Sequence, residues 1–222
     1  MNSVLVIAAH ADDEALGCAG TIAKHIKHGD KITVVFMTDG VSSRVICENI
    51  NENDRKGSAE KAMKTLGVSD LRQYSFPDNK MDSLPLLDIV KVIENIISEV
   101  KPSIIYTHFA HDLNIDHRVT HAAVMTACRP QLGASVKKIL SFEVLSSTEW
   151  NSPSHQTFLP QYIVDITEFW DKKLAVLRCY HDEMRDFPHS RSYECVEALA
   201  TLRGATHGFK KGEAFFVERI LD

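Results

Sequence analysis

The sequence lacks the features that mark three broad classes of protein. No apolar run approaches the roughly 20 residues that a membrane-spanning helix needs. The first apolar run is too short for a signal-peptide core, has no basic leader and ends in acidic residues. The five cysteines are far apart and form no CxxC pair, which argues against a disulfide framework and a cysteine-type zinc site. We therefore expect a cytoplasmic protein without a membrane span.

Basic residues are also scarce relative to acidic ones. The chain carries 25 Lys and Arg against 30 Asp and Glu, a formal net charge of −5. This balance argues against a general nucleic-acid-binding protein, whose affinity comes from basic surface. The 222 residues, 44% of them hydrophobic, suffice for one α/β domain with a sizeable core.

Apolar runs and helix-like segments alternate over residues 1–145. Five runs predict buried strands: Ser3–Ala9, Lys31–Met37, Leu71–Ser75, Ser103–Thr107 and Lys138–Phe142. Four segments between them predict helices: Glu14–His28, Asp54–Leu66, Leu84–Val100 and Asp116–Ala127. This alternation predicts an α/β fold with a mostly parallel sheet and helices on both faces.

The chain after residue 145 is less regular. Ser146–Gln161 is polar, contains two prolines and is typical of a long loop. The segments that follow predict a strand at Tyr162–Val164, helices near Thr167–His181 and Arg191–Arg203, and a last strand at Ala214–Ile220. We expect residues 1–222 to form a single domain in which 146–222 is an α/β elaboration that shapes the substrate pocket.

A dense polar group from His10 to Glu14 lies where the first predicted strand turns into the first predicted helix. Acidic residues are favoured in the first turn of a helix, so helix capping is one interpretation of its three carboxylates. Capping does not account for His10. A zinc hydrolase site accounts for His10 and the carboxylates, because such a site needs nitrogen and oxygen ligands together with a spare carboxylate as base.

A second polar group, from His108 to His121, follows the fourth predicted strand. The carboxyl ends of parallel strands share one rim of the sheet, so the two groups can meet there. A His and a carboxylate from the first group and a His from the second would form a three-ligand zinc site with one position open for water. His117 and His121 are both candidate ligands, and His117 is favoured because it lies at the mouth of the helix. His108 and His111 are candidates for contacts around the metal or with substrate.

The two groups together resemble the signature of the PIG-L/LmbE-like zinc de-N-acetylases. The first resembles the family's His-Pro-Asp-Asp-Glu motif, and Asp116-His117-Arg118 resembles its Asp-His-Arg motif. Further matches are Leu16-Gly17, Gly20-Thr21 and the helix that carries Arg55 and ends at Leu66-Gly67-Val68. The resemblance implies a Rossmann-like fold and removal of an acetyl group, usually from an amino sugar, with Arg55 among the substrate contacts.

The resemblance also implies roles for the residues of both motifs. His10, Asp13 and His117 would bind one zinc ion per chain. Asp12 would be the general base, and Asp116 would support the catalytic machinery.

Two positions depart from the family pattern. Ala11 replaces the usual Pro, which removes no ligand. Asn114 occupies the place of a His that assists at the transition state, and Asn can donate a hydrogen bond but no proton at neutral pH. Either Asn114 stabilises the oxyanion, or His108 or His111 supplies the missing cation.

The C-terminal part offers four further candidates for substrate contacts. Arg191, beside His189, can grip a phosphate or carboxylate in bidentate fashion, although a surface loop with Ser190 as helix cap is also consistent. Glu149 and Trp150 suit the hydroxyls and the face of a sugar, although a packed Trp is equally consistent.

Three other functions fit part of the sequence. A dinucleotide-binding oxidoreductase would need a glycine-rich first turn, but acidic residues fill that turn and Gly17 and Gly20 come late. A zinc hydrolase of another amide or of an ester would have the same reaction centre. A non-catalytic metal- or sugar-binding module would have no use for Asp12. The expected partner is a small N-acetylated sugar, and the sequence leaves open whether the chain forms a homo-oligomer.

Overall fold

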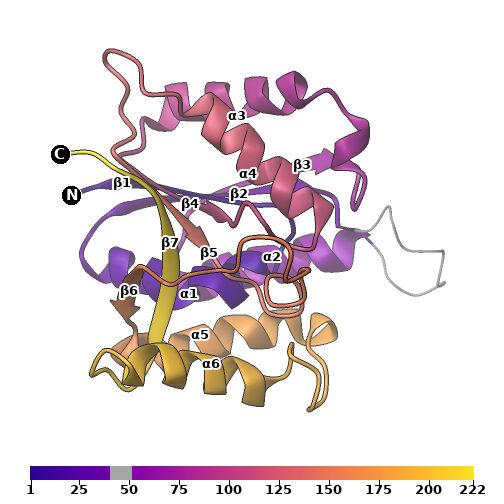
Figure 1. Ribbon diagram of the computed structural model, residues 1–222, viewed down its shortest axis with the longest axis vertical. Coiled ribbons are helices and arrows are strands. Elements are labelled where there is room, and N and C mark those ends of the chain that lie inside the picture. The colour runs from indigo at the N-terminus through magenta and orange to yellow at the C-terminus, as the bar shows by residue number, and fades with distance from the viewer. Residues whose placement is uncertain (41–51) are drawn as a thin grey trace.

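The computed structural model describes residues 1–40 and 52–222, with side chains from residue 56 onward in the second range. In this part of the chain seven strands form one sheet (Figure 1). They are β1 (Ser3–Ala8), β2 (Lys31–Thr38), β3 (Asp70–Phe76), β4 (Ile104–His108), β5 (Lys138–Phe142), β6 (Tyr162–Asp165) and β7 (Gly212–Ile220). The strand order is β3-β2-β1-β4-β5-β7-β6. Strands β1 to β5 are parallel and β7 is antiparallel to both of its neighbours, which confirms the predicted mostly parallel sheet.

Helices cover both faces of the sheet, as the alternation predicts. They are α1 (Asp13–Lys27), α2 (Glu52–Leu66), α3 (Leu86–Val100), α4 (Ile115–Ala127), α5 (Trp170–Leu177) and α6 (Tyr193–Ala205). Figure 1 shows α3 and α4 on one side of the sheet and the other four helices on the opposite side. The predicted helix Thr167–His181 is α5 with a short 3-10 turn at each end. In the described part of the chain, no helix combines the length and apolar character needed to cross a membrane.

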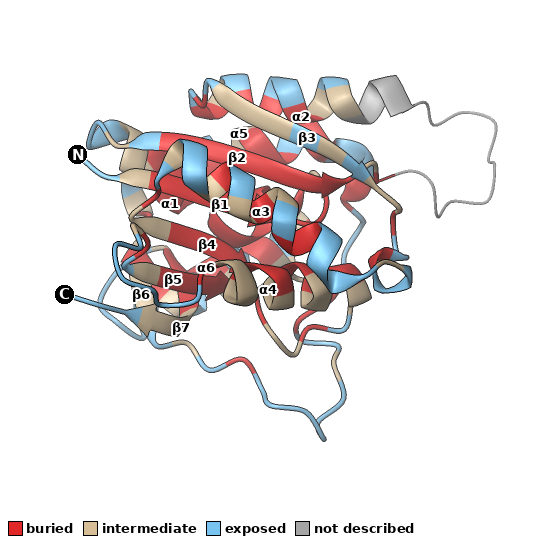
Figure 2. Cartoon of the chain, turned by 90° about the horizontal axis from the view of Figure 1, so that it is seen from above, coloured by how far each residue is buried: buried red, intermediate tan, exposed pale blue. Residues whose placement is uncertain are grey.

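Strand β1 is apolar on both faces because both faces are buried. Val4 and Val6 pack in a cluster with residues of α1 and α2, whereas Leu5 and Ile7 pack in a second cluster with α3 and α4. Figure 2 shows the central strands as mostly buried, with the exposed positions on the outer faces of the helices. This packing holds the carboxyl ends of β1 and β4 side by side, where the strand order reverses and ligands bind in folds of this kind.

Helix α1 is interrupted at Cys18, where φ is −149°. Side chains from the C-terminal part supply hydrogen-bond partners near this break. Glu213 on β7 accepts bonds from the N–H groups of Gly20 (3.0 Å) and Thr21 (2.7 Å). Lys173 on α5 donates to a backbone carbonyl of α1 and forms a buried ion pair with Glu213 at 2.7 Å. The elaboration therefore braces the helix that carries the first polar group.

This bracing can be tested by replacing Lys173 with Met. Because Glu213 would stay buried without its counter-charge, we expect the free energy of unfolding to fall by about 3–5 kcal/mol in urea denaturation. The control Lys172→Met, at the exposed neighbouring position, should change it by less than about 0.5 kcal/mol. The double variant Lys173→Met/Glu213→Gln should be more stable than Lys173→Met alone, and equal stability of the two would contradict this account.

Candidate metal centre

The structure brings the three predicted metal ligands together at the reversal point of the sheet. His10 lies in the turn after β1, Asp13 is the first residue of α1, and His117 is in the first turn of α4. Asp13 Oδ2 lies 3.2 Å from His10 Nδ1 and 3.2 Å from His117 Nε2, and the two imidazole nitrogens are 3.3 Å apart. All three side chains are buried, and their donor atoms can meet at one metal ion.

Charges of opposite sign compensate for burial in this cluster. Burial opposes a charged imidazole, but Asp13 and Asp112 together raise the pKa of His117 to about 9. Burial also opposes an ionised Asp13, yet the charge of His117 and the hydrogen bond from His10 help to hold the pKa of this carboxyl well below its usual range. The site thus keeps an ionised carboxylate between imidazoles, a donor set that suits a divalent metal of borderline softness.

Asp12 has a backbone conformation that is rare for residues other than glycine, with φ 125°. It occupies the N-cap position of α1, but its side chain accepts no bond from the helix. Its carboxylate instead accepts a 2.8 Å bond from Arg191, and its backbone N–H donates to Glu14. Such strain costs about 1–3 kcal/mol and collects at functional sites. Helix capping therefore does not explain Asp12.

The second nitrogen of His10 faces two buried carboxylates. Nε2 lies 3.1 Å from Asp78 Oδ1 and 3.1 Å from Asp116 Oδ2. Asp116 also accepts bonds from the backbone N–H groups of Asn79 (2.6 Å) and Met81 (3.0 Å). Asp116 thus orients His10 and fixes the segment after β3. Sequence analysis missed Asp78, although its position just after a predicted strand was a usable signal.

Asp112, which sequence analysis also missed, orients His117. Asp112 Oδ1 lies 3.1 Å from His117 Nδ1, and its two carboxylate oxygens accept bonds from the hydroxyls of Ser147 and Thr148. Burial works against its ionisation, but His117 and the hydroxyl donors hold the pKa of Asp112 at about 2. A carboxylate that holds the far nitrogen of a ligand histidine is a common support in metal sites.

Asn114 is the N-cap of α4 and also lines the cavity at the centre. Its Oδ1 accepts a 2.8 Å bond from the Asp116 N–H, and its Nδ2 donates to Asn79 Oδ1 at 3.1 Å. The residue that replaces the family's histidine is therefore held firmly at the site.

Neither of the two histidines considered as substitutes for that group lines the cavity. His108 is fully buried, its Nε2 accepts a 2.8 Å bond from the Ala9 N–H, and its ring stacks on His117 with centroids 3.9 Å apart. Burial and the neighbouring His117 hold the pKa of His108 well below its usual range, so its ring is neutral. The ring of His111 lies against Phe109, away from the residues that line the cavity.

Residues 146–222 bring Arg191 into the site from the far end of the chain. Its Nη1 contacts Asp12 and its Nε donates to Ser146 Oγ at 3.0 Å. His189 Nδ1 accepts a 3.0 Å bond from the Arg191 backbone N–H. The surface-loop interpretation is therefore wrong for Arg191, because its guanidinium is part of the cavity wall.

The other predicted contacts from the C-terminal part do not line the cavity themselves. Ser192, not Ser190, caps α6. The carboxylate of Glu149 accepts bonds from two backbone N–H groups of its own turn. Trp150 is half exposed and touches the His189 ring. The side chain of Arg55 lies outside the described residues.

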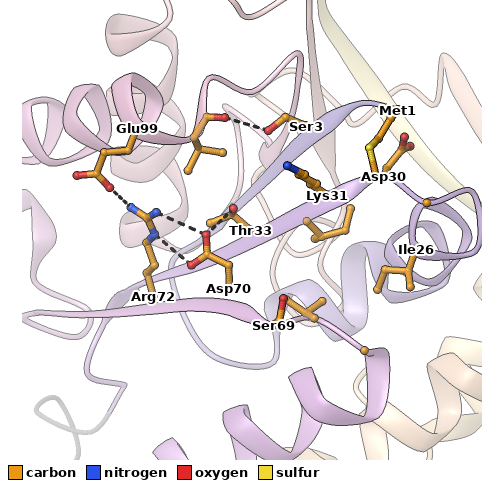
Figure 3. Close-up of a pocket in the computed structure, with 15 residues that line it drawn as sticks. Met1, Ser3, Ile26, Asp30, Lys31, Thr33, Ser69, Asp70, Arg72 and Glu99 are labelled. Atoms are coloured by element: carbon orange, nitrogen blue, oxygen red, sulfur yellow. Dashed lines mark hydrogen bonds and ion pairs between the residues drawn. The ribbon is translucent and has the colours of Figure 1, made fainter.

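A cavity of about 160 Å³ opens onto the three ligands. Its wall also includes Asp12, Asp78, Asn79, Asn114, Glu183 and Arg191. A larger cavity of about 530 Å³ lies at the amino-terminal ends of β1 to β3, the opposite edge of the sheet (Figure 3). There Arg72 pairs with Asp70 and Glu99, whereas the metal-ligand cluster belongs to the smaller cavity. The smaller cavity is therefore the candidate site, because it contains the donor atoms that can bind a metal ion.

Comparisons with known proteins point to one family. Residues 5–128 match the PIG-L family, described as GlcNAc-PI de-N-acetylase. The uncharacterized deacetylase YaiS of Escherichia coli is 32% identical over 181 residues, which cover 79% of this chain and 88% of that protein. A probable N-acetyl-alpha-D-glucosaminyl L-malate deacetylase 2 of Bacillus cereus is 28% identical over 81% of this chain and 83% of its own length.

Solved structures share the fold. The N,N'-diacetylchitobiose deacetylase from Pyrococcus horikoshii superposes with a TM-score of 0.77 at 22% identity, covering 97% of this chain and 83% of that one. A different activity is also represented among the matches. The 4-oxalmesaconate hydratase of Pseudomonas putida is 26% identical over 80% of this chain and 72% of that protein.

The support that Asp112 gives to His117 predicts a measurable effect on metal affinity. We expect Asp112→Asn to weaken binding of a divalent cation by about 10- to 100-fold, because His117 would lose the carboxylate that orients it. Competition with a chromogenic chelator measures this affinity. Asp88→Asn, at an exposed position on α3, is the matched control. Equal affinities for the two variants would refute the role of Asp112.

Proposed function

The chain belongs to the PIG-L family of de-N-acetylases, and from this premise we propose that it is a zinc-dependent hydrolase that removes the acetyl group of an N-acetylated amino sugar or sugar conjugate. The observation that carries the proposal is the triangle of donor atoms from His10, Asp13 and His117, with sides of 3.2, 3.2 and 3.3 Å. Tetrahedral zinc with bonds of about 2.0–2.2 Å separates its ligands by about 3.3–3.6 Å, so the donors need almost no movement to bind it.

Zinc, when bound, supplies a Lewis acid that makes water reactive at neutral pH. Asp12 accepts the proton of the attacking water and returns it to the departing amine. Arg191 binds the Asp12 carboxylate at 2.8 Å and orients it in the cavity wall. The second N–H of the Asn114 amide stabilises the negative charge that develops on the acetyl oxygen. His108 stacks on the ring of His117 and takes no part in proton transfer.

The substrate contacts divide between the two parts of the chain. Residues 1–145 supply the metal ligands, whereas 146–222 supply Arg191, with His189 and Trp150 in contact next to it. Glu149 acts indirectly by shaping the turn before Trp150. The polar cavity wall suits the hydroxyls of a small sugar, and the amino-sugar conjugates named for several relatives support this substrate class.

The alternative is a zinc hydrolase of another amide or of an ester, which would use the same donor set. A dinucleotide-binding oxidoreductase is disfavoured by Asp12 and Asp13, which fill the turn where a pyrophosphate would bind and would repel its charge.

Metal loading and acetate release test the proposal directly. We expect one zinc ion per chain, acetate release from N-acetylglucosamine or its conjugates, loss of activity on chelation and recovery on zinc addition. A panel of free, nucleotide-linked and lipid-linked N-acetyl sugars covers the substrate class. No acetate from any of them would refute the deacetylase, and hydration of 4-oxalmesaconate would instead assign the chain to the hydratase activity.

The roles of the adjacent acids predict opposite effects. Asp12→Asn should lower kcat by roughly 10²–10⁴-fold, because proton transfer loses its base, while leaving the zinc content unchanged. Asp13→Ala should lose the metal itself, because it removes the carboxylate shared by both histidines. Turnover and metal content measured on the same samples distinguish the two roles. Near-normal turnover of Asp12→Asn would remove the base assignment.

A further inference from the structure

Trp150 exposes 50% of its surface, and its backbone N–H is bonded to Ser147, a residue of the cavity wall. Several hydrogen bonds hold the turn that carries it in place. The Trp150 N–H donates to the Ser147 carbonyl at 3.2 Å, and Glu149 accepts bonds from two N–H groups of the same turn. The Asn151 side chain donates to the His111 carbonyl. The indole is therefore presented by a fixed backbone, and its exposed apolar area can meet a ligand.

Three contacts connect Trp150 to the proposed base. The edge of its ring meets the His189 ring, with centroids 5.3 Å apart and planes at 73°. His189 Nδ1 accepts a bond from the Arg191 N–H, and the Arg191 guanidinium binds Asp12. A continuous series of contacts through His189 and Arg191 thus connects Trp150 to Asp12.

The volume of the cavity limits the size of the ligand that it can enclose at the reaction centre. Its volume of about 160 Å³ is well below the roughly 300–1,000 Å³ of pockets that enclose whole drug-sized ligands. Its wall is polar, with Asn79, Asn114 and Glu183 among its residues, and suits one hydroxylated ring. Any group attached to that ring has to extend beyond the cavity, and Trp150 offers exposed apolar surface two contacts away from Arg191 in its wall.

We propose that Trp150 forms an outer subsite for a second sugar ring, so that the preferred substrate contains at least two rings. The inference rests on the proposed function, since the first ring is the acetylated one held at the metal. The broad indole face covers the apolar C–H face of a pyranose. Because the Glu149 carboxylate is engaged by its own turn, stacking rather than hydrogen bonding provides the affinity of this subsite.

The first test compares N-acetylglucosamine with its β-1,4-linked dimer by acetate release. The dimer should have the lower KM in the unsubstituted protein. Trp150→Ala should raise the KM for the dimer about 5- to 10-fold, the size of one lost aromatic contact, and should raise the KM for the monomer by a clearly smaller factor. Trp150→Phe keeps a smaller ring, so its KM for the dimer should lie between the values of the unsubstituted protein and of Trp150→Ala.

The second test measures binding without hydrolysis. The chain has two tryptophans, Trp150 and Trp170, and Trp170 lies on α5 next to Lys211. In Trp170→Phe the emission comes from Trp150 alone, and the deacetylated glucosamine dimer should change it whereas glucosamine should not. Trp150→Phe, in which only Trp170 emits, is the matched control and should respond to neither sugar.

The two tests separate the inference from the function on which it rests. Acetate from the monomer or the dimer supports the deacetylase whatever Trp150 does, and no acetate from any sugar refutes it. Equal effects of Trp150→Ala on monomer and dimer would overturn the outer subsite, as would equal KM values for the two sugars in the unsubstituted protein. An unchanged Trp150 emission at a dimer concentration that saturates the enzyme would also overturn it.

Discussion

The buried carboxylate of Asp13, held between His10 and His117, is the constraint around which the rest of the site is organised. An ionised carboxylate is costly to bury unless opposite charge and hydrogen bonds compensate for it. Two histidines supply that compensation here, and each is held in turn by a further carboxylate, Asp116 behind His10 and Asp112 behind His117. The resulting set of rigidly oriented donors can bind a cation with little rearrangement.

The sheet makes this arrangement geometrically possible. Strands β1 and β4 are neighbours at the point where the strand order reverses, so the turns that follow them face each other. The C-terminal elaboration completes the site from the other side. Lys173 and Glu213 brace the interrupted helix α1, and Arg191 binds the side chain of Asp12. One part of the chain thus provides the metal ligands, and the other holds the carboxylate that stands beside them.

Much of this could be predicted from the sequence. The alternation of apolar strands and helices indicated the parallel sheet. Motifs at strand ends that converge on one rim indicated a site of two histidines and a carboxylate, and the resemblance to the PIG-L family singled out His10, Asp13 and His117. Asp78, despite its position after a predicted strand, and Asp112 were not selected, because their roles depend on which nitrogen of a histidine they face. His108 was a candidate for chemistry because it shares a motif with His117, yet its place inside strand β4 turns its ring into the core.

The sequence by itself determined the fold class and the chemical type of the site, because strand periodicity and motif spacing are local properties of the chain. Only the tertiary structure decided which carboxylate supports which histidine, that Arg191 reaches Asp12 across 179 positions of sequence, and that Trp150 contacts His189 next to Arg191. These relations depend on how strands and loops distant in the chain are packed against one another. Such packing is set by the burial of the whole core, and no single segment carries a signal for it.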